Sequence, residues 1–276
     1  MSDKNQPMPK PRKNPELMQS YLYWREVMLM RQRHELRRQA VERGVSNMDA
    51  DIEASIISVF DPMLKDAKKS MVAWGKACGP VWDWLTSIKG LGEGGMAAQL
   101  LAMIDDIGNF ATVSKLWRHA GYGMGDYWTV NGKQVAPVVG WQWKGDGDNR
   151  EMVRVRPEQK PEWVLKSTRD VAIKDWVLPY NRKLKSLCYL VTEQFIKQQT
   201  PGYVDVYYEE KERQARLNPD LTKLHIHRRA MRKVSKILLQ HLWVTWREME
   251  GLPVSEPYAH AILLHTHCIE PEPVSA

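Results

Sequence analysis

Two long segments with helical periodicity, separated by a glycine, dominate the N-terminal part of the chain. The first begins at residues 14–16, which are Asn-Pro-Glu. Asparagine caps helices well, proline fits the first helical position, and glutamate faces the positive end of the helix dipole. We expect this helix to run to about Val41 and to end at Gly44. Residues 1–13 are rich in proline and lysine and poor in apolar side chains, which predicts a flexible basic arm.

The second segment carries an apolar residue at every third or fourth position. The series is Ile52, Ile56, Val59, Phe60, Met63, Leu64, Ala67, Met71 and Trp74. This spacing places the side chains on one face of a helix. We expect Ser46 or Asn47 to cap it, Pro62 to kink it and Gly79-Pro80 to end it. Residues 14–80 therefore predict a long helical hairpin or coiled coil, through which copies of the chain self-associate.

A glycine-rich turn between two short apolar helices is the most informative segment for function. Helices are expected over residues 81–87 and 96–104, and residues 88–95 between them are Ile-Lys-Gly-Leu-Gly-Glu-Gly-Gly. The pattern is typical of a helix-hairpin-helix, to which we assign residues 81–121. Glycines with positive φ let the backbone approach a phosphate, and N–H groups at the start of the second helix attract anions. The predicted phosphate ligands are Lys89, Gly90, Leu91, Gly92, Gly94 and Gly95.

The turn has two other interpretations. It can be a plain turn in an all-helical protein. A nucleotide-binding GxGxxG motif fits less well, because no strand precedes the glycines.

Residues 122–178 differ in character and predict a small β-rich insertion. The turn Asn131-Gly132 lies between two β-forming runs and predicts a hairpin. Residues 138–143 and 151–156 flank a second polar turn and predict another. The insertion contains Trp128, Trp141, Trp143, Trp163 and Trp176. Tryptophan rings can stack on unpaired bases, but we expect these to form the core of the small sheet.

Helices are expected to resume at residue 179 and to continue to residue 258, followed by a tail over residues 259–276. Positive charge gathers on two of these helices. The basic residues are Arg182, Lys183, Lys185, Arg228, Arg229, Arg232, Lys233 and Lys236. Such clusters favour contact with a polyanion, although a solvated face is the common alternative. The predicted fold class is mainly α, with the β insertion between the helix-hairpin-helix and the C-terminal helices.

Composition excludes several protein classes. The net charge is +7, 43% of residues are hydrophobic and the mean hydropathy is −0.50, which argues against a disordered or membrane-embedded chain. No apolar run reaches the roughly 18–20 residues of a membrane span, and no secretory signal is recognisable, so we expect a cytoplasmic, nucleoid-associated protein. The three cysteines are far apart, which indicates reduced thiols. The histidines at 225–227 and 260–267 lack zinc-site spacing. We expect no metal or cofactor, except Mg²⁺ if a nuclease partner or a hidden active site uses it.

Several segments, taken in order, carry a resemblance to a known family. They are residues 88–121 with the Ala-Gly pair at 120–121, residues 181–187 with the sequence Asn-Arg-Lys-Leu-Lys-Ser-Leu, and residues 211–213 and 230–258. These segments resemble the C-terminal domain of DEDD-type insertion-sequence transposases, the family of pilin-gene invertases and bridge recombinases. The resemblance implies DNA binding in transposition or recombination of a mobile element or phage.

Two departures from that family concern catalysis. The family carries an RNase-H-like domain with a metal-binding acidic tetrad, whereas only the arm and one helix precede residue 46. The family also places a nucleophilic serine in the loop after its Ala-Gly pair, whereas residues 121–127 contain no serine. Ser167 is a weak candidate nucleophile that lacks flanking glycines and lies in an expected helix. We therefore expect a DNA-binding protein without its own complete catalytic site.

Two alternatives stay open. The first is an active transposase or recombinase with a non-standard nucleophile, for which Ser167, Tyr122 and Tyr127 are the candidates. The second is an RNA-binding or structural assembly subunit, in which the tryptophan-rich insertion binds structured RNA or a partner protein. A separate nuclease subunit is a further partner to consider.

Overall fold

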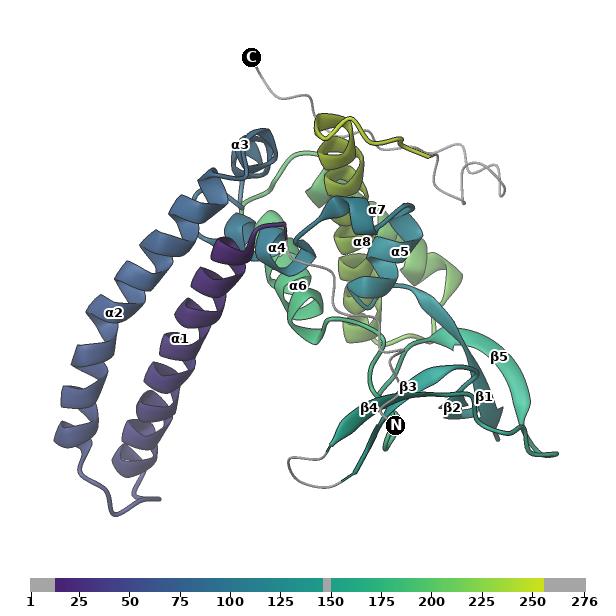
Figure 1. The fold of residues 1–276 in the computed structure, drawn as a ribbon, viewed down its shortest axis with the longest axis horizontal. Helices are drawn as coiled ribbons and strands as arrows, with labels where there is room; N and C mark the ends of the chain where they lie inside the picture. The colour runs from purple at the N-terminus through teal and green to yellow at the C-terminus, as the bar shows by residue number, and fades with distance from the viewer. Residues whose placement is uncertain (1–12, 146–149, 256–276) are drawn as a thin grey trace, which may run out of the picture. The chain divides into compact units, whose positions relative to one another are not determined.

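The computed structural model describes residues 13–145 and 150–255, and these divide into two compact units that meet in the sequence between Asn109 and Phe110 (Figure 1). The predicted fold class is confirmed: the chain is mainly helical, with a long N-terminal helix pair, a small β insertion and C-terminal helices. The expected tail and all of the expected arm except Lys13 lie outside the described residues.

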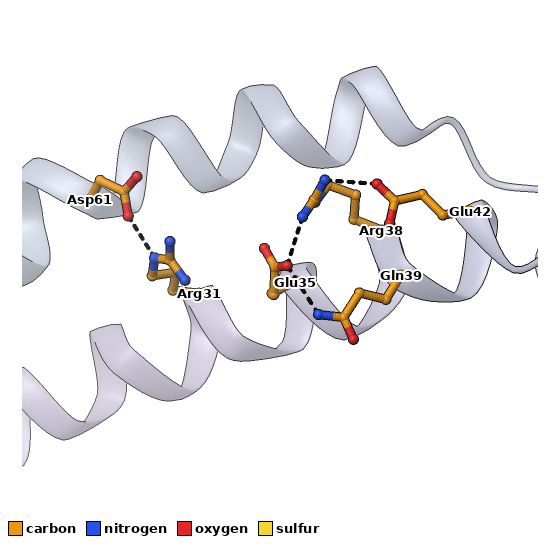
Figure 2. Close-up of polar contacts among 6 residues, drawn as sticks. All are labelled: Arg31, Glu35, Arg38, Gln39, Glu42 and Asp61. Carbon is orange, nitrogen blue, oxygen red and sulfur yellow. Dashed lines mark hydrogen bonds and ion pairs between the residues drawn. The ribbon is translucent and has the colours of Figure 1, made fainter.

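The first unit is built on two long antiparallel helices that lie side by side, α1 (Pro15–Glu42) and α2 (Ala50–Lys76) (Figure 1). Figure 2 shows an ion pair that joins them, in which Arg31 Nε lies 2.5 Å from Asp61 Oδ1. A second link is His34 Nδ1, which lies 2.6 Å from Oε2 of the buried Glu53. The predicted helical hairpin is held by these polar contacts and by buried apolar residues of α2 such as Ile57 and Met71. The predicted apolar face is only partly buried, because Ile52, Val59, Met63 and Trp74 are exposed.

Two details of helix capping differ from expectation. Asn14 stands at the N-cap of α1, but its side-chain amide donates to the carbonyl oxygen of Asp105 at 3.2 Å instead of capping the helix. The cap of α2 is Asp49, not Ser46 or Asn47, and its carboxylate accepts from the backbone N–H of Asp51 at 2.8 Å. Helix α2 is therefore capped by the residue directly before its first helical position. Helix α2 continues through Pro62.

Three short elements complete the first unit: α3 (Pro80–Ser87), α4 (Met96–Ile104) and a 3₁₀ turn, η1 (Ile107–Asn109). Helix α4 is buried along most of its length, and Tyr21 of α1 donates its hydroxyl to Met103 Sδ at 3.7 Å. Leu17 of α1 and Met71 of α2 are fully enclosed in the same core. The long helices and the hairpin helices thus share one apolar interior.

The second unit is organised around the longest of its helices, α8 (Lys223–Met249), which packs against α5 (Val113–His119), α6 (Arg182–Lys197) and α7 (Tyr203–Leu217) (Figure 1). Trp243 is fully buried, and its indole N–H donates to the carbonyl oxygen of Phe110 at 2.6 Å. On the α6 side, the buried hydroxyls of Thr192 and Ser235 lie 2.9 Å apart. This packing fixes the rotation of α8 about its axis, and so decides which of its basic residues face outward.

The insertion forms two antiparallel sheets. One has the strand order β2-β1-β5, from β1 (Met124–Val130), β2 (Lys133–Pro137) and β5 (Val164–Arg169), and the other pairs β3 (Gly140–Lys144) with β4 (Glu151–Val155). Both predicted hairpins are confirmed, and Asn131-Gly132 has the positive φ values that a tight turn needs.

Strand β5 is a correction to the expected helix around Ser167, which instead pairs with Asp126 of β1. Residues 164–169 have no strong pattern of their own, and pairing along β1 makes them a strand.

The tryptophans of the insertion also differ from expectation. All five are half-buried or exposed, and Trp143 is 50% exposed. The enclosed tryptophans are Trp82, Trp84, Trp243 and Trp246, which belong to helices. The insertion therefore presents indole surface rather than a closed aromatic core.

Candidate nucleic-acid interface

The hairpin turn between α3 and α4 has the backbone conformation that the glycines predict. Gly90, Gly92 and Gly95 have φ values of 99°, 48° and 98°. Gly95 is the N-cap of α4, and a Cβ on it would lie 3.2 Å from Met71 Cε, so the turn sits close against α2. Leu91 is buried and anchors the turn from inside. Any phosphate contact here is made by backbone N–H groups and by exposed Lys89.

One acidic residue of the turn is already neutralised. Glu93 Oε2 lies 2.9 Å from Lys76 Nζ at the end of α2. Both side chains are exposed, so this pair contributes little to stability. It does reduce the repulsion that Glu93 would otherwise exert on a phosphate at the turn.

A pocket of about 560 Å³ lies in the second unit, where the end of β5 meets α6 and α8. We call it the cationic pocket. Its lining residues are Gly121, Tyr122, Thr168, Arg169, Asp170, Val171, Lys185, Tyr189, Arg228, Met231, Arg232 and Ser235. Four of them are basic, and Asp170 is the only carboxylate among them.

The cations of this pocket destabilise one another. Burial lowers the pKa of Arg232, and the nearby Arg169 lowers it further. Burial also lowers the pKa of Lys185, and Arg232 and Arg169 add to that effect. The pKa of Lys236, one turn beyond Arg232, is lowered by burial and by Arg232. A bound anion would relieve this repulsion, so the pocket is electrostatically suited to one.

Backbone geometry brings these cations close together. Arg232 Nη2 donates to the carbonyl oxygen of Tyr122 at 2.8 Å. Gly121 has a φ of 76°, and a Cβ there would lie 2.9 Å from Lys185 Cδ. A side chain at position 121 would therefore clash with the Tyr180 ring and with the Lys185 side chain.

Asp170 is a buried counter-charge at the edge of the pocket. Tyr127 donates its hydroxyl to Oδ1, and Arg118 Nη2 lies 4.0 Å from the same oxygen. The second oxygen, Oδ2, is buried and has no hydrogen-bond partner among the described residues. Asp170 raises the pKa of Lys185, but burial and the two arginines outweigh it.

The five basic residues predicted on α8 separate into three groups: two line the pocket, two contact α7 and one contacts Trp117 of α5. Arg228 and Arg232 line the pocket, whereas Arg229 and Lys233 face α7. Arg229 Nη1 donates to Gln214 Oε1 at 2.7 Å, and Lys233 Nζ lies 3.2 Å from Oε2 of the buried Glu210. Lys236 Nζ lies 3.8 Å from the centre of the Trp117 ring. Arg229 and Lys233 therefore hold two helices together.

On α6, only Lys185 of the three predicted basic residues lines the pocket. Arg182 and Lys183 are exposed on the first turn, which Asn181 caps by accepting from the N–H of Lys183 at 3.0 Å. Sequence reasoning missed Arg169 and Asp170. Their only signal was their position at the end of a strand that itself was not predicted.

The candidate nucleophiles are poorly placed for catalysis. Ser167 is exposed on β5 and does not line the pocket. Tyr122 and Tyr127 are 7% and 3% exposed, and burial raises the pKa of both phenols. Tyr122 donates to the carbonyl oxygen of Lys185 at 3.3 Å. A buried phenol with a raised pKa is a weak nucleophile.

Two features of the described residues bear on other functions. Over residues 13–145 and 150–255, no three His, Cys, Asp or Glu side chains are grouped as metal ligands would be. No helix in that part of the chain has the length and apolarity to cross a membrane. In comparisons with known proteins, the chain matched no family model and no curated protein.

Proposed function

We propose that this protein binds DNA through its phosphate backbone, and that the cationic pocket is the principal contact. The observation that carries the proposal is a set of four basic residues around one pocket, opposed by a single carboxylate. Burial, and after it repulsion between the cations, lowers the pKa values of Lys185 and Arg232, so an anion placed beside them would stabilise their charged forms. Phosphate oxygens supply the missing negative charge, and arginine binds them through paired N–H groups.

The hairpin turn is the second proposed contact. The positive-φ glycines at 90 and 92 shape the turn, and the space around Gly92 is open, so its backbone is the part of the turn that a phosphate would approach. Contacts of this kind position a protein on DNA without identifying bases. The proposal is therefore for binding that depends weakly on sequence.

The biological role proposed is transposition or recombination of a mobile element or phage. It rests on the likeness of residues 88–121 and 181–187 to the insertion-sequence transposases. The lack of a serine in the loop at 121–127, and the burial of Tyr122 and Tyr127, favour a DNA-binding role in which a separate nuclease subunit with its own Mg²⁺ supplies catalysis. Such a protein acts in the cytoplasm, at the nucleoid.

Titration with a fluorescent DNA duplex at several salt concentrations tests DNA binding. We expect affinity to fall as salt rises, because bound cations are released from DNA. The double variant Arg169→Gln/Arg228→Gln removes two exposed pocket charges and should bind about tenfold more weakly, with a salt slope smaller by about two. Arg216→Gln/Lys223→Gln, which removes two exposed charges of the same unit outside the pocket, is the matched control. Absence of binding at low salt, or equal losses in the control, would contradict the proposal.

We further propose that two copies associate through α2. Ile52, Val59, Met63 and Trp74 are exposed along one stripe of this helix. Two α2 helices aligned antiparallel would cover this stripe with the same apolar residues of the other copy, so the surface is self-complementary and favours a second copy as the partner.

Light scattering after size exclusion measures this association. A dimer is expected for the unmodified chain and a monomer for Ile52→Ser/Val59→Ser. Val45→Ser, at an exposed apolar residue outside α2, is the control and should remain a dimer. If the unmodified protein is a monomer, self-association is contradicted, but the proposal that the protein binds DNA is not affected.

A further inference from the structure

The second unit contains another pocket, of about 350 Å³, which we call the aromatic pocket. Its lining combines planar aromatic rings, guanidinium groups and apolar side chains. The residues are Arg118, Tyr127, Pro137, Val139, Gly140, Trp141, Arg154, Val171, Ile173, Trp176, Val177 and Pro179. Pockets of this size with a few polar groups are typical sites for small planar ligands.

The aromatic pocket adjoins the cationic pocket. Val171 lines both. Tyr127 lines the aromatic pocket and donates its hydroxyl to Asp170, which lines the cationic one. Arg118, another lining residue of the aromatic pocket, lies 4.0 Å from the same carboxylate. The two pockets are therefore separated by one layer of side chains.

The two tryptophans of the aromatic pocket are held by backbone packing while part of each ring surface stays accessible. A Cβ on Gly140 would lie 2.8 Å from Trp176 Cε3, so this glycine lets the Trp176 ring rest on β3. The carbonyl oxygen of Trp141 accepts from the N–H of Val177 at 2.8 Å. Both side chains are half-buried. They are thus fixed surfaces, and binding against them costs little side-chain entropy.

We propose that the aromatic pocket takes an unpaired nucleobase whose adjoining phosphate lies in the cationic pocket. This inference rests on the proposed function, because it assumes that the cationic pocket binds a nucleic-acid phosphate. Bases stack favourably on tryptophan and on guanidinium planes whatever their identity. In an intact duplex each base is already stacked and paired, and extracting it costs free energy. The protein therefore prefers single-stranded or locally unpaired nucleic acid to uninterrupted duplex.

The test compares three DNA probes at one salt concentration: a single strand of 20 nucleotides, its duplex, and the same duplex with four central mismatches. The full chain should bind the mismatched duplex and the single strand about tenfold more tightly than the perfect duplex. Trp176→Ala should abolish this preference and retain the affinity for perfect duplex. Trp143→Ala, on β3 but outside the pocket, is the matched control and should keep the preference. RNA strands of the same sequence show whether the pocket prefers a base from DNA or from RNA. Weaker binding of Trp176→Ala to the DNA strand or to the RNA strand would support base binding in the aromatic pocket.

Because Trp176→Ala removes a packed ring, a second measurement uses the unmodified protein. A single strand with 5-iodouracil is photocrosslinked and the adducts are mapped by mass spectrometry. Adducts at Trp141 or Trp176 are expected, and adducts found only elsewhere would overturn the inference. Equal affinity for perfect and mismatched duplex, or a preference that survives in folded Trp176→Ala, would also overturn it while leaving phosphate binding intact. Absence of binding to every probe would overturn the proposed function as well.

Discussion

Arg228 and Arg229 are neighbours on α8, yet their surroundings differ. Arg228 lines the cationic pocket, and no carboxylate of the described residues forms an ion pair with it. Arg229 donates to Gln214, and Lys233 one turn further on pairs with buried Glu210. One face of α8 therefore carries positive charge that a ligand can contact. The adjacent face uses arginine and lysine to hold α7 in place. A basic cluster in a sequence does not reveal this division.

Replacing Glu210 tests the face that holds α7 and should give the largest effect. Glu210 is 3% exposed and contacts Lys233, Arg213 and Gln214. Glu210→Ala leaves these donors without their partner and should lower the free energy of unfolding by about 2 kcal/mol. Urea denaturation measures the change. Glu212→Ala, exposed on the same helix, should change stability by less than about 0.5 kcal/mol, and similar losses in both variants would refute the assignment.

The same contacts predict a pH dependence. Burial acts to raise the pKa of Glu210, but hydrogen bonds from Arg213, Gln214 and Lys233 outweigh it, and the pKa falls below the ordinary 4.5. A carboxylate with a lowered pKa in the folded state stabilises fully above the unfolded value, and that contribution is lost as pH falls through the folded value. The stability difference between the unmodified protein and Glu210→Gln should therefore shrink below about pH 4.5. Urea titrations at pH 7 and pH 3 measure it, and a constant difference would argue against a charged Glu210.

Reversing the charge of Arg228 or of Arg229, one at a time, tests directly whether the two residues have different roles. Arg228→Glu should weaken DNA binding about tenfold, because it places a carboxylate beside the bound phosphate. Arg229→Glu alters the net charge equally, but should weaken binding only about twofold, through the general field, and should also lower stability. Fluorescence anisotropy measures the DNA affinity of both variants, and urea denaturation measures their stability. Equal losses of affinity would show that α8 acts only as a diffuse basic surface.

The hairpin turn differs from the cationic pocket, because its proposed phosphate contacts are mainly backbone N–H groups rather than side chains. Gly90→Val/Gly92→Val introduces β-branched residues at positive φ and should weaken DNA binding about fivefold, without altering preference among sequences. Circular dichroism establishes whether the variant is folded. Unaltered affinity in a folded variant would leave the cationic pocket as the sole contact.

The smallest expected effect is a change in the free energy of unfolding when a basic residue of the cationic pocket is replaced. Arg169 is exposed and lowers the pKa values of both Lys185 and Arg232. Arg169→Gln should therefore leave unfolding unchanged or raise its free energy by up to about 0.5 kcal/mol, while DNA binding weakens. A clear loss of stability would indicate that Arg169 has a structural role.

Local signals predicted much of the fold. The helix of residues 15–42, the helices at 80–87 and 96–104, and the hairpin at Asn131-Gly132 lie where capping, periodicity and turn residues place them. Strand β5 was missed because its stability comes from pairing with β1, which lies far away in the sequence. Arg169 and Asp170 were missed with it.

The sequence by itself determined the elements that depend on neighbouring residues: the long helices, the glycines with positive φ and the two β-hairpins. Only the tertiary structure decided which basic residues line a pocket and which bind α7, because that depends on how α8 is rotated by its buried contacts. It also decided that the insertion tryptophans stay half-buried or exposed, whereas Trp243 and Trp246 are buried in the helical core. A sequence states which residues are charged or aromatic. Which of them are exposed, and which side chains they contact, is decided only when distant segments of the chain pack together.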